Sequence, residues 1–165
     1  MPKKYNITQY KVIIFDFDGV FTDNLALIDS EGNEYVKINR SDGIGIEILK
    51  KMQLKLFIVS SEKNRVVQQR AKKLGIQCFN PINDKPQTIK QISSDLKIPL
   101  KKFIYVGNDL NDYHSMKLTG LKICPSDSHS KIKRISDIIL KSKGGEGVSR
   151  EIVENIFKIN ITKFF

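Results

Sequence analysis

The chain has 165 residues, of which 40% are hydrophobic and 28% are charged, and its formal net charge is +10. This length fits one domain, and the composition excludes a fully disordered chain. The longest apolar runs fall far short of the ~20 residues needed to cross a membrane, and two cysteines cannot build a disulfide framework. We therefore expect one reduced, cytoplasmic domain over residues 1–165, without a membrane segment.

The positive charge comes mainly from 23 lysines that are spread along the whole chain, with only 5 arginines. Such a balance indicates either a Lys-rich solvated surface or an anionic ligand, which could be a small phosphate or a nucleic acid. Nucleic acid is the less favoured ligand, because arginines are few and aromatic residues make up only 8% of the chain.

Short apolar runs alternate with amphipathic segments along the chain. Continuous apolar runs are typical of parallel strands that are covered on both faces, and the alternation predicts βαβ units. The predicted strands are residues 11–16, 55–59, 103–106, 121–123 and 138–140, and the predicted helices are residues 41–52, 64–74, 85–96 and 111–119. The fold class is therefore α/β, with a mostly parallel central sheet flanked by helices.

Local residues support the predicted helix ends. Gly75 and Gly120 follow two of the helices in the position of a C-terminal cap. Asp84 precedes the helix that carries Pro86 in its first turn, as an N-terminal cap would. Residues 25–38 break the alternation, because two short runs flank the turn-forming residues 29–33. This segment predicts a β-hairpin inserted after the first strand.

Two carboxylates follow the first predicted strand. Asp16 and Asp18 lie where the carboxyl end of a parallel strand meets ligands, and Gly19 permits a sharp turn after them. Two adjacent carboxylates repel each other unless a cation lies between them, and Mg²⁺ prefers such hard oxygen ligands. An ordinary polar turn is the alternative interpretation.

A second acidic run, residues 107–112 (GNDLND), follows the third long strand. Capping the next helix needs only one of its Asn or Asp side chains, so capping does not explain why the run contains four. Two acidic strand ends in one basic domain predict a cation site. Ser60 and Ser61 follow the strand at 55–59, where hydroxyls and backbone N–H groups can hold a phosphate. Lys85 begins a helix, where the dipole disfavours a cation, so we expect it to bind a phosphate as well.

Together these motifs resemble the haloacid dehalogenase superfamily of phosphatases. The order DxDGVxTD, Ser60, Lys85 and GNDLND spans nearly the whole chain. Within the superfamily the sequence resembles the capless group of 3-deoxy-octulosonate 8-phosphate and 2-keto-3-deoxynononate 9-phosphate phosphatases. The supporting segments are the hairpin, residues 41–45 (SDGIG), residues 70–75 (RAKKLG) and residues 144–151 (GGEGVSRE). The resemblance implies a Rossmann-like fold without a cap domain.

The resemblance also implies roles for individual residues. Asp16 would be the nucleophile that becomes phosphorylated, and Asp18 would be the general acid and base. Mg²⁺ would be held by Asp16, by the backbone carbonyl of Asp18 and by Asn108. The phosphoryl oxygens would contact Ser60, Ser61 and Lys85, with Asp109 and Asp112 in supporting positions. Many relatives have Asp where this chain has Asn108, so we expect weaker metal binding unless Asp109 compensates.

The substrate implied is a keto-deoxy sugar acid phosphate. Glu62 and Lys63 after Ser61, together with Lys73, favour a nine-carbon, sialic-acid-type 9-phosphate over 3-deoxy-octulosonate 8-phosphate, a lipopolysaccharide precursor. Glu62 and Lys73 could equally form a solvated helix face. The set expected to contact the sugar is Glu62, Lys73, Arg70 and Arg150.

The resemblance further implies a homotetramer in which residues 25–38 form an interface and a neighbouring subunit covers the active site. Residues 158–165 form an apolar C-terminal tail that a lone monomer would leave exposed. Two other functions stay open at this point. One is a phosphatase for nucleotides or nucleic-acid ends, and the other is a catalytically weak regulator of a sugar-acid cytidylyltransferase.

Overall fold

A computed structural model describes residues 5–165 of the chain. Its centre is a six-stranded sheet with the order β5-β4-β1-β6-β7-β8, in which every neighbouring pair is parallel. The strands are β1 (Val12–Phe15), β4 (Lys55–Val59), β5 (Gln77–Phe79), β6 (Phe103–Val106), β7 (Leu121–Cys124) and β8 (Ile138–Ile139). The predicted α/β fold with a parallel central sheet is confirmed.

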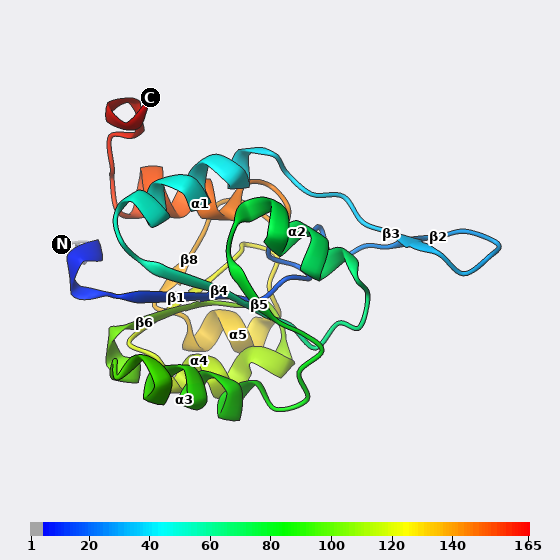
Figure 1. Cartoon of the computed structure of the whole chain (residues 1–165), viewed down its shortest axis with the longest axis horizontal. Helices are drawn as coiled ribbons and strands as arrows, with labels where there is room; N and C mark the ends of the chain where they lie inside the picture. The colour runs from blue at the N-terminus through cyan, green and yellow to red at the C-terminus, as the bar shows by residue number, and fades with distance from the viewer. Residues whose placement is uncertain (1–4) are drawn as a thin grey trace.

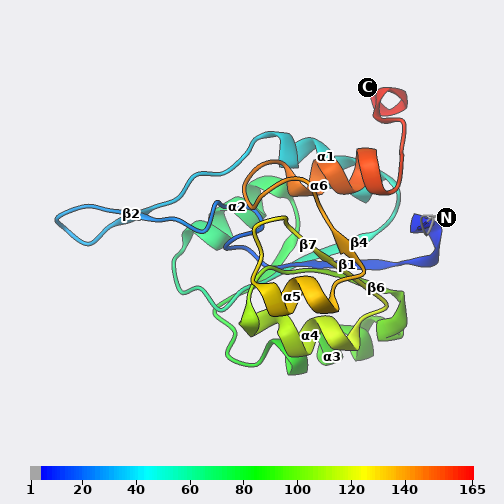
Figure 2. The same ribbon diagram turned by 180° about the vertical axis from the view of Figure 1, so that it is seen from behind.

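Helices cover both faces of this sheet (Figures 1 and 2). One face carries α1 (Ser41–Lys51), α2 (Val66–Leu74) and α6 (Val148–Glu151), and the other carries α3 (Lys85–Leu96), α4 (Tyr113–Leu118) and α5 (Ser130–Ile135). A π-helical turn, Ile152–Ile156, continues α6, and 3-10 turns occupy Ile7–Gln9, Leu100–Lys102, Leu110–Asp112 and Ile161–Phe164. Within residues 5–165, no helix combines the length and the apolar character that a bilayer span requires.

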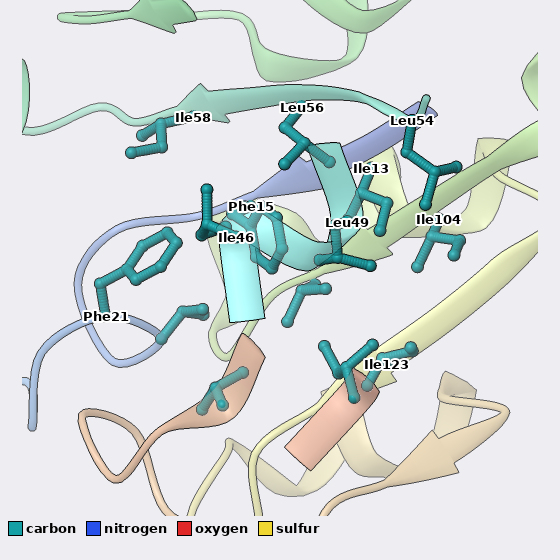
Figure 3. Packing of buried hydrophobic residues seen from close by; sticks show 14 of the residues in the cluster. Ile13, Phe15, Phe21, Ile46, Leu49, Leu54, Leu56, Ile58, Ile104 and Ile123 are labelled. Carbon is teal, nitrogen blue, oxygen red and sulfur yellow. The ribbon is translucent and has the colours of Figure 1, made fainter. Parts of the chain in front are cut away.

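Strand β1 lies in the middle of the sheet and is buried on both faces. Ile13 and Phe15 belong to the core beneath α1 and α6, while Val12 and Ile14 belong to the core beneath α3 and α4. Figure 3 shows Phe15 among the side chains of the first of these cores. Phe21, which follows β1, packs on Phe15 with ring centroids 5.2 Å apart. This contact fixes the turn after β1, where the acidic motif lies.

The segment inserted after β1 contains an antiparallel hairpin of β2 (Leu27–Ile28) and β3 (Glu34–Tyr35). Its paired strands are shorter than the runs predicted over 25–28 and 34–38. Asp29 closes the turn by accepting hydrogen bonds from the backbone N–H groups of Glu31 and Asn33, both at 2.9 Å. The hairpin projects from the side of the sheet at which β1 ends (Figure 1).

Two of the predicted helix caps are confirmed and one is wrong. Gly75 ends α2 in the left-handed conformation with φ 63°, and Asp84 caps α3 by accepting from the N–H of Gln87. Gly120 is not a left-handed cap, because α4 already ends at Thr119 with an extended backbone. A Cβ at Gly120 would lie 1.9 Å from the carbonyl oxygen of Lys101, so the glycine permits close packing of two backbones.

Candidate active site

The functional cavity lies at the carboxyl edge of the sheet, between the ends of β1, β4 and β6. This is the point where the chain, having added strands on one side of β1, crosses to the other side, which is where parallel α/β sheets bind ligands. The cavity has a volume of about 310 Å³. Its lining residues are Asp16, Asp18, Asn24, Ser60, Ser61, Asn108, Asp109, Leu110 and Asn111.

Asp16 lies at the bottom of this cavity and is held from three directions. Its backbone N–H donates to the carbonyl oxygen of Val106 at 2.9 Å, which continues the pairing of β1 with β6. Its Oδ1 accepts from the N–H of Phe17 at 2.8 Å, and the Nζ of Lys85 lies 2.8 Å from the same oxygen. Only 4% of Asp16 is exposed, and that part faces the cavity. The carboxylate is therefore fixed in one orientation.

Lys85 forms a buried bridge between two carboxylates. Its Nζ lies 2.8 Å from Asp16 Oδ1 and 2.8 Å from Asp112 Oδ1. Burial, followed by the negative charge of Asp112, raises the pKa of Asp16, although the Lys85 ammonium lowers it. Burial lowers the pKa of Lys85, but the two carboxylates outweigh it and leave that pKa raised. With both carboxylates ionised, the group carries one more negative than positive charge, which a divalent cation in the cavity would compensate.

Asp112 connects this bridge to the loop after β6. Its Oδ1 accepts from both Lys85 Nζ and the hydroxyl of Tyr105 at 2.8 Å, and its Oδ2 accepts from the N–H of Asn108 at 3.0 Å. Burial and the neighbouring carboxylates raise the pKa of Tyr105, so the hydroxyl keeps its proton and donates. Sequence reasoning missed Tyr105, because a tyrosine in an apolar strand looks like an ordinary core residue.

Asn108 carries the feature that fits a metal ion. The residue is 93% buried, and its Oδ1 has no hydrogen-bond partner among residues 5–165. Gly19, with φ 76°, packs against it so closely that a Cβ would lie 1.8 Å from Asn108 Nδ2. An unpartnered buried oxygen beside Asp16 and Asp18 is a suitable Mg²⁺ ligand. The candidate ligand set combines two aspartates with one amide. Residues 5–165 contain no cluster of three or more His, Cys, Asp or Glu side chains that could hold a metal, so this candidate site depends on the amide.

Asp18 lies in the turn that follows β1, above Asp16. Its Oδ1 accepts from the hydroxyl of Thr22 at 3.5 Å, and that hydroxyl accepts in turn from the N–H groups of Gly19 and Asn24 at 3.2 Å. Burial, and next the negative charge of Glu62, raise the pKa of Asp18. Thr22 and Asn24 were not predicted as site residues. Thr22 is part of the DxDGVxTD motif, but no function was predicted for it.

The end of β4 supplies the hydroxyl side of the cavity. Ser60 is 1% exposed, and its Oγ accepts from the N–H of Glu62 at 3.1 Å. Ser61 Oγ accepts from Asn111 Nδ2 at 3.3 Å, which joins the end of β4 to the loop after β6. Asp109 lines the opposite rim, where its carboxylate caps a 3-10 turn through the N–H of Leu110 at 2.7 Å.

The residues expected to contact the sugar lie outside this cavity within one subunit. Lys73 is in the last turn of α2, and because β4 and β5 are parallel, that end of α2 lies at the opposite edge of the sheet. Arg70 is buried and donates to the carbonyl oxygen of Asn39 at 3.0 Å. Arg150 pairs with Glu154 on its own helix at 2.8 Å. The structure thus separates these three cations from the lining residues.

Glu62 lies closer to the cavity but is not among its lining residues. Its carboxylate accepts from the N–H of Asn64 at 2.8 Å, and its carbonyl oxygen accepts from Asn80 Nδ2 at 3.3 Å. Its charge acts on Asp18 across the site. In this chain it therefore shapes the loop after Ser60.

Comparisons with known proteins identify the family of this chain. The haloacid dehalogenase-like hydrolase family matches residues 70–152. The 3-deoxy-D-manno-octulosonate 8-phosphate phosphatase of Escherichia coli (strain B / BL21-DE3) is 29% identical over 155 residues, which cover 93% of this chain and 81% of that protein.

Two solved structures extend the comparison. A Streptomyces avermitilis protein described as a HAD family hydrolase has a TM-score of 0.93 and 34% identity, covering 98% of this chain and 92% of that one. The Moraxella catarrhalis 3-deoxy-D-manno-octulosonate 8-phosphate phosphatase, solved with a magnesium ion, a phosphate ion and a KDO molecule, has a TM-score of 0.89 and 30% identity, covering 96% and 92%. The chain therefore belongs to the haloacid dehalogenase-like hydrolases, in the capless group of 3-deoxy-octulosonate 8-phosphate phosphatases, and is a phosphoric monoester hydrolase.

Proposed function

We propose that this chain is a Mg²⁺-dependent phosphatase that removes the terminal phosphate of 3-deoxy-octulosonate 8-phosphate. The observation that carries the proposal is the cavity lined by Asp16, a fixed carboxylate, and by Asn108, whose buried Oδ1 has no hydrogen-bond partner within residues 5–165. Similarity to phosphatases of this eight-carbon sugar acid supports the choice of substrate. The nine-carbon sugar acid expected from Glu62 and Lys73 becomes the second candidate, because Lys73 lies at the other edge of the sheet.

In the first half of the reaction, Asp16 attacks the phosphorus atom. One carboxylate oxygen forms a bond to phosphorus while the bond from phosphorus to the sugar oxygen breaks, which leaves the phosphoryl group on Asp16. The carboxyl group of Asp18 gives its proton to the departing sugar oxygen. Ser60 and the backbone after it hold the phosphoryl oxygens. Lys85 fixes Asp16 for the attack through their 2.8 Å contact.

In the second half, water replaces Asp16 on phosphorus. The Asp18 carboxylate takes a proton from that water, the new oxygen–phosphorus bond forms, and Asp16 leaves as a free carboxylate. Mg²⁺, held by Asp16, the Asp18 carbonyl and Asn108, would supply charge neutralisation for the phosphoryl oxygens. The fixed positions of Asp16 and Lys85 mean that little reorganisation accompanies either half.

Phosphate release from a panel of esters tests this function. The panel contains 3-deoxy-octulosonate 8-phosphate, a nine-carbon keto-deoxy sugar 9-phosphate, a nucleotide and p-nitrophenyl phosphate, each with Mg²⁺ and with EDTA. We expect the eight-carbon ester to have the highest kcat/KM, EDTA to abolish turnover, and Asp16→Asn to lose at least ~1,000-fold in kcat. Asp95→Asn, an equal change on the exposed face of α3, should keep full activity. A preference for another ester would change the substrate, and an active Asp16→Asn protein would reject the mechanism.

We also propose that the chain works as a homotetramer through its hairpin. Leu25, Leu27, Ile28 and Tyr35 are each more than half exposed there, and together they form an apolar surface on a projecting element. Isolated apolar residues on a surface are ordinary, but four on one small hairpin favour a protein contact. Within residues 5–165 no cap domain covers the cavity, so a neighbouring subunit would supply the cover.

A further inference from the structure

The segment between β8 and the first turn of α6, residues 141–149, is held by carboxylates from several parts of the fold. We refer to it as the anchored loop. Glu151 accepts from the N–H groups of Lys141 and Ser142 at 2.9 and 2.7 Å, and Asp127 accepts from the N–H of Gly144 at 3.0 Å. None of these groups has a part in the reaction described above, so their convergence on one loop needs another explanation.

Asp42 fixes the end of the anchored loop to α1. Its Oδ1 accepts from the N–H of Ser149 at 2.9 Å and from the Ser149 hydroxyl at 2.8 Å, and Asp42 is completely buried. The two backbones approach closely, since a Cβ at Gly45 would lie 2.6 Å from the backbone carbonyl carbon of Ser149. Gly147, with φ 85°, also lies close to α1, since a Cβ there would lie 2.7 Å from the Ser41 hydroxyl oxygen. The anchored loop cannot shift on α1 without disrupting these contacts.

The other side of the anchored loop presses on the turn that carries Asp18. A Cβ at Gly144 would lie 2.3 Å from the carbonyl oxygen of Gly19 and 2.8 Å from that of Thr22. Gly145 N–H donates to the carbonyl oxygen of Val20 at 3.0 Å. Thr22 is also the residue whose hydroxyl donates to Asp18. The anchored loop therefore contacts the backbone of the turn at residues 19–22, which lie between Asp18 and the Thr22 hydroxyl that donates to it.

We propose that the anchored loop is a positioning element for proton transfer by Asp18, with Gly144 as its contact and the Asp42–Ser149 pair as its attachment. This inference rests on the proposed function and assigns a role to Asp42 and Gly45 on α1 and to the segment 144–149. Asp16 is fixed separately, by β6 and Lys85. A small displacement of the loop should therefore impair protonation of the leaving group while the nucleophile stays in place.

Two substrates separate these effects. An alkyl phosphate such as 3-deoxy-octulosonate 8-phosphate releases a strongly basic oxygen that must receive the Asp18 proton, whereas p-nitrophenyl phosphate releases a weak base that needs none. The ratio kcat/KM covers only the steps up to phosphorylation of Asp16, so the later attack by water does not enter it. For Gly144→Ala we expect kcat/KM to fall about 100-fold with the alkyl ester and less than about 3-fold with p-nitrophenyl phosphate.

Two control variants make the result interpretable. Gly43→Ala is the matched glycine change, because its Cβ would meet nothing closer than Leu74 at 4.0 Å, and it should leave both values unchanged. Asp18→Asn should show the same selectivity as Gly144→Ala. If Asp18→Asn slows both esters equally, the proposed acid role is wrong. If Asp18→Asn is selective and Gly144→Ala is not, the positioning role alone is wrong.

Two further measurements cover folding and the metal site. Circular dichroism checks the fold of Gly144→Ala, and if that variant does not fold, Ser149→Ala replaces it. Ser149→Ala keeps the backbone contact to Asp42 and loses the two hydroxyl contacts, to the Oδ1 and to the carbonyl oxygen of Asp42, so we expect a selective loss of about 3- to 10-fold. The Mg²⁺ concentration for half-maximal activity should stay within 2-fold of its original value. A larger change would mean that the loop positions the metal ligands, the Asp18 carbonyl or Asn108, and it would overturn the proposal.

Discussion

A buried ion-pair group is formed by Lys85 with Asp16 and Asp112, and no more than 4% of any of the three residues is exposed. One ammonium between two carboxylates leaves a net negative charge, and low-dielectric surroundings make that excess costly. Asn108 lines the same cavity as Asp16, but its amide side chain adds no charge of its own. The site therefore offers a divalent cation one negative charge fewer than it would with aspartate at position 108.

Asn108→Asp tests how much this neutral ligand matters. The added carboxylate would attract Mg²⁺ more strongly, so we expect the Mg²⁺ concentration for half-maximal phosphatase activity to fall about 10-fold, which corresponds to ~1.4 kcal/mol. A titration of activity against Mg²⁺ measures it. Asn111→Asp on the rim of the same cavity is the matched control, and it should change the half-maximal concentration much less. An unchanged or raised value in Asn108→Asp would show that position 108 does not hold the cation.

Residues placed directly after strands were predictable as a group. Asp16, Ser60 and Asn108 each follow an apolar strand, so the parallel sheet alone brings them to one cavity. The position of Lys73 depends instead on the length of α2 and on the direction in which that helix returns to the sheet. Tyr105 depends on a contact across the core with Asp112, which no local pattern indicates.

At the scale of elements, an unbroken apolar run decides which strands the sequence reveals. β1 and β6 are covered on both faces and form such runs, and β8 was found because it is also apolar, although it is half-buried or exposed. β5 was missed because it is a three-residue edge strand that begins with the exposed Gln77. α5 and α6, with 6 and 4 residues, were also missed because they give too few turns for a periodic pattern. α4 is as short as α5, but the 3-10 turn directly before it lengthens the helical pattern that was predicted over residues 111–119.

Helix α3 ends at a lysine, Lys97, in the left-handed conformation, which is unfavourable for any residue with a Cβ atom. Lys97 is the C-terminal cap with φ 55° and ψ 36°, and its side chain is exposed. Glycine adopts this left-handed conformation without a steric cost. Lys97→Gly should therefore raise the free energy of unfolding by about 0.5–1 kcal/mol, as measured by urea denaturation. Lys90→Gly, inside the same helix, should lower it by about 1 kcal/mol. A loss of stability in Lys97→Gly would contradict the strain argument.

At the scale of the whole molecule, the hairpin carries the densest group of exposed apolar side chains. The sheet and its helices form a body with a Lys-rich exterior, whereas the hairpin carries Leu25, Leu27 and Ile28 at 62–71% exposure. Both strands of the hairpin are exposed, and in the described part of the chain the hairpin projects away from the helices (Figure 2). A two-stranded ribbon is marginally stable by itself in water. Burial against other copies would stabilise both the ribbon and its apolar side chains.

The hairpin proposal predicts that one charge on its apolar surface separates the subunits. Leu27 is 71% exposed, so Leu27→Asp should leave the fold of each subunit intact while placing a desolvated charge in the interface. Size-exclusion chromatography with light scattering should then show about four times the chain mass for the unmodified protein and a smaller species for the variant. Ile139→Asp is the matched control, because Ile139 is also exposed, at 50%, but lies on β8. An unmodified protein that elutes as a monomer would contradict the tetramer, and a Leu27→Asp variant that keeps the full mass would move the interface away from the hairpin.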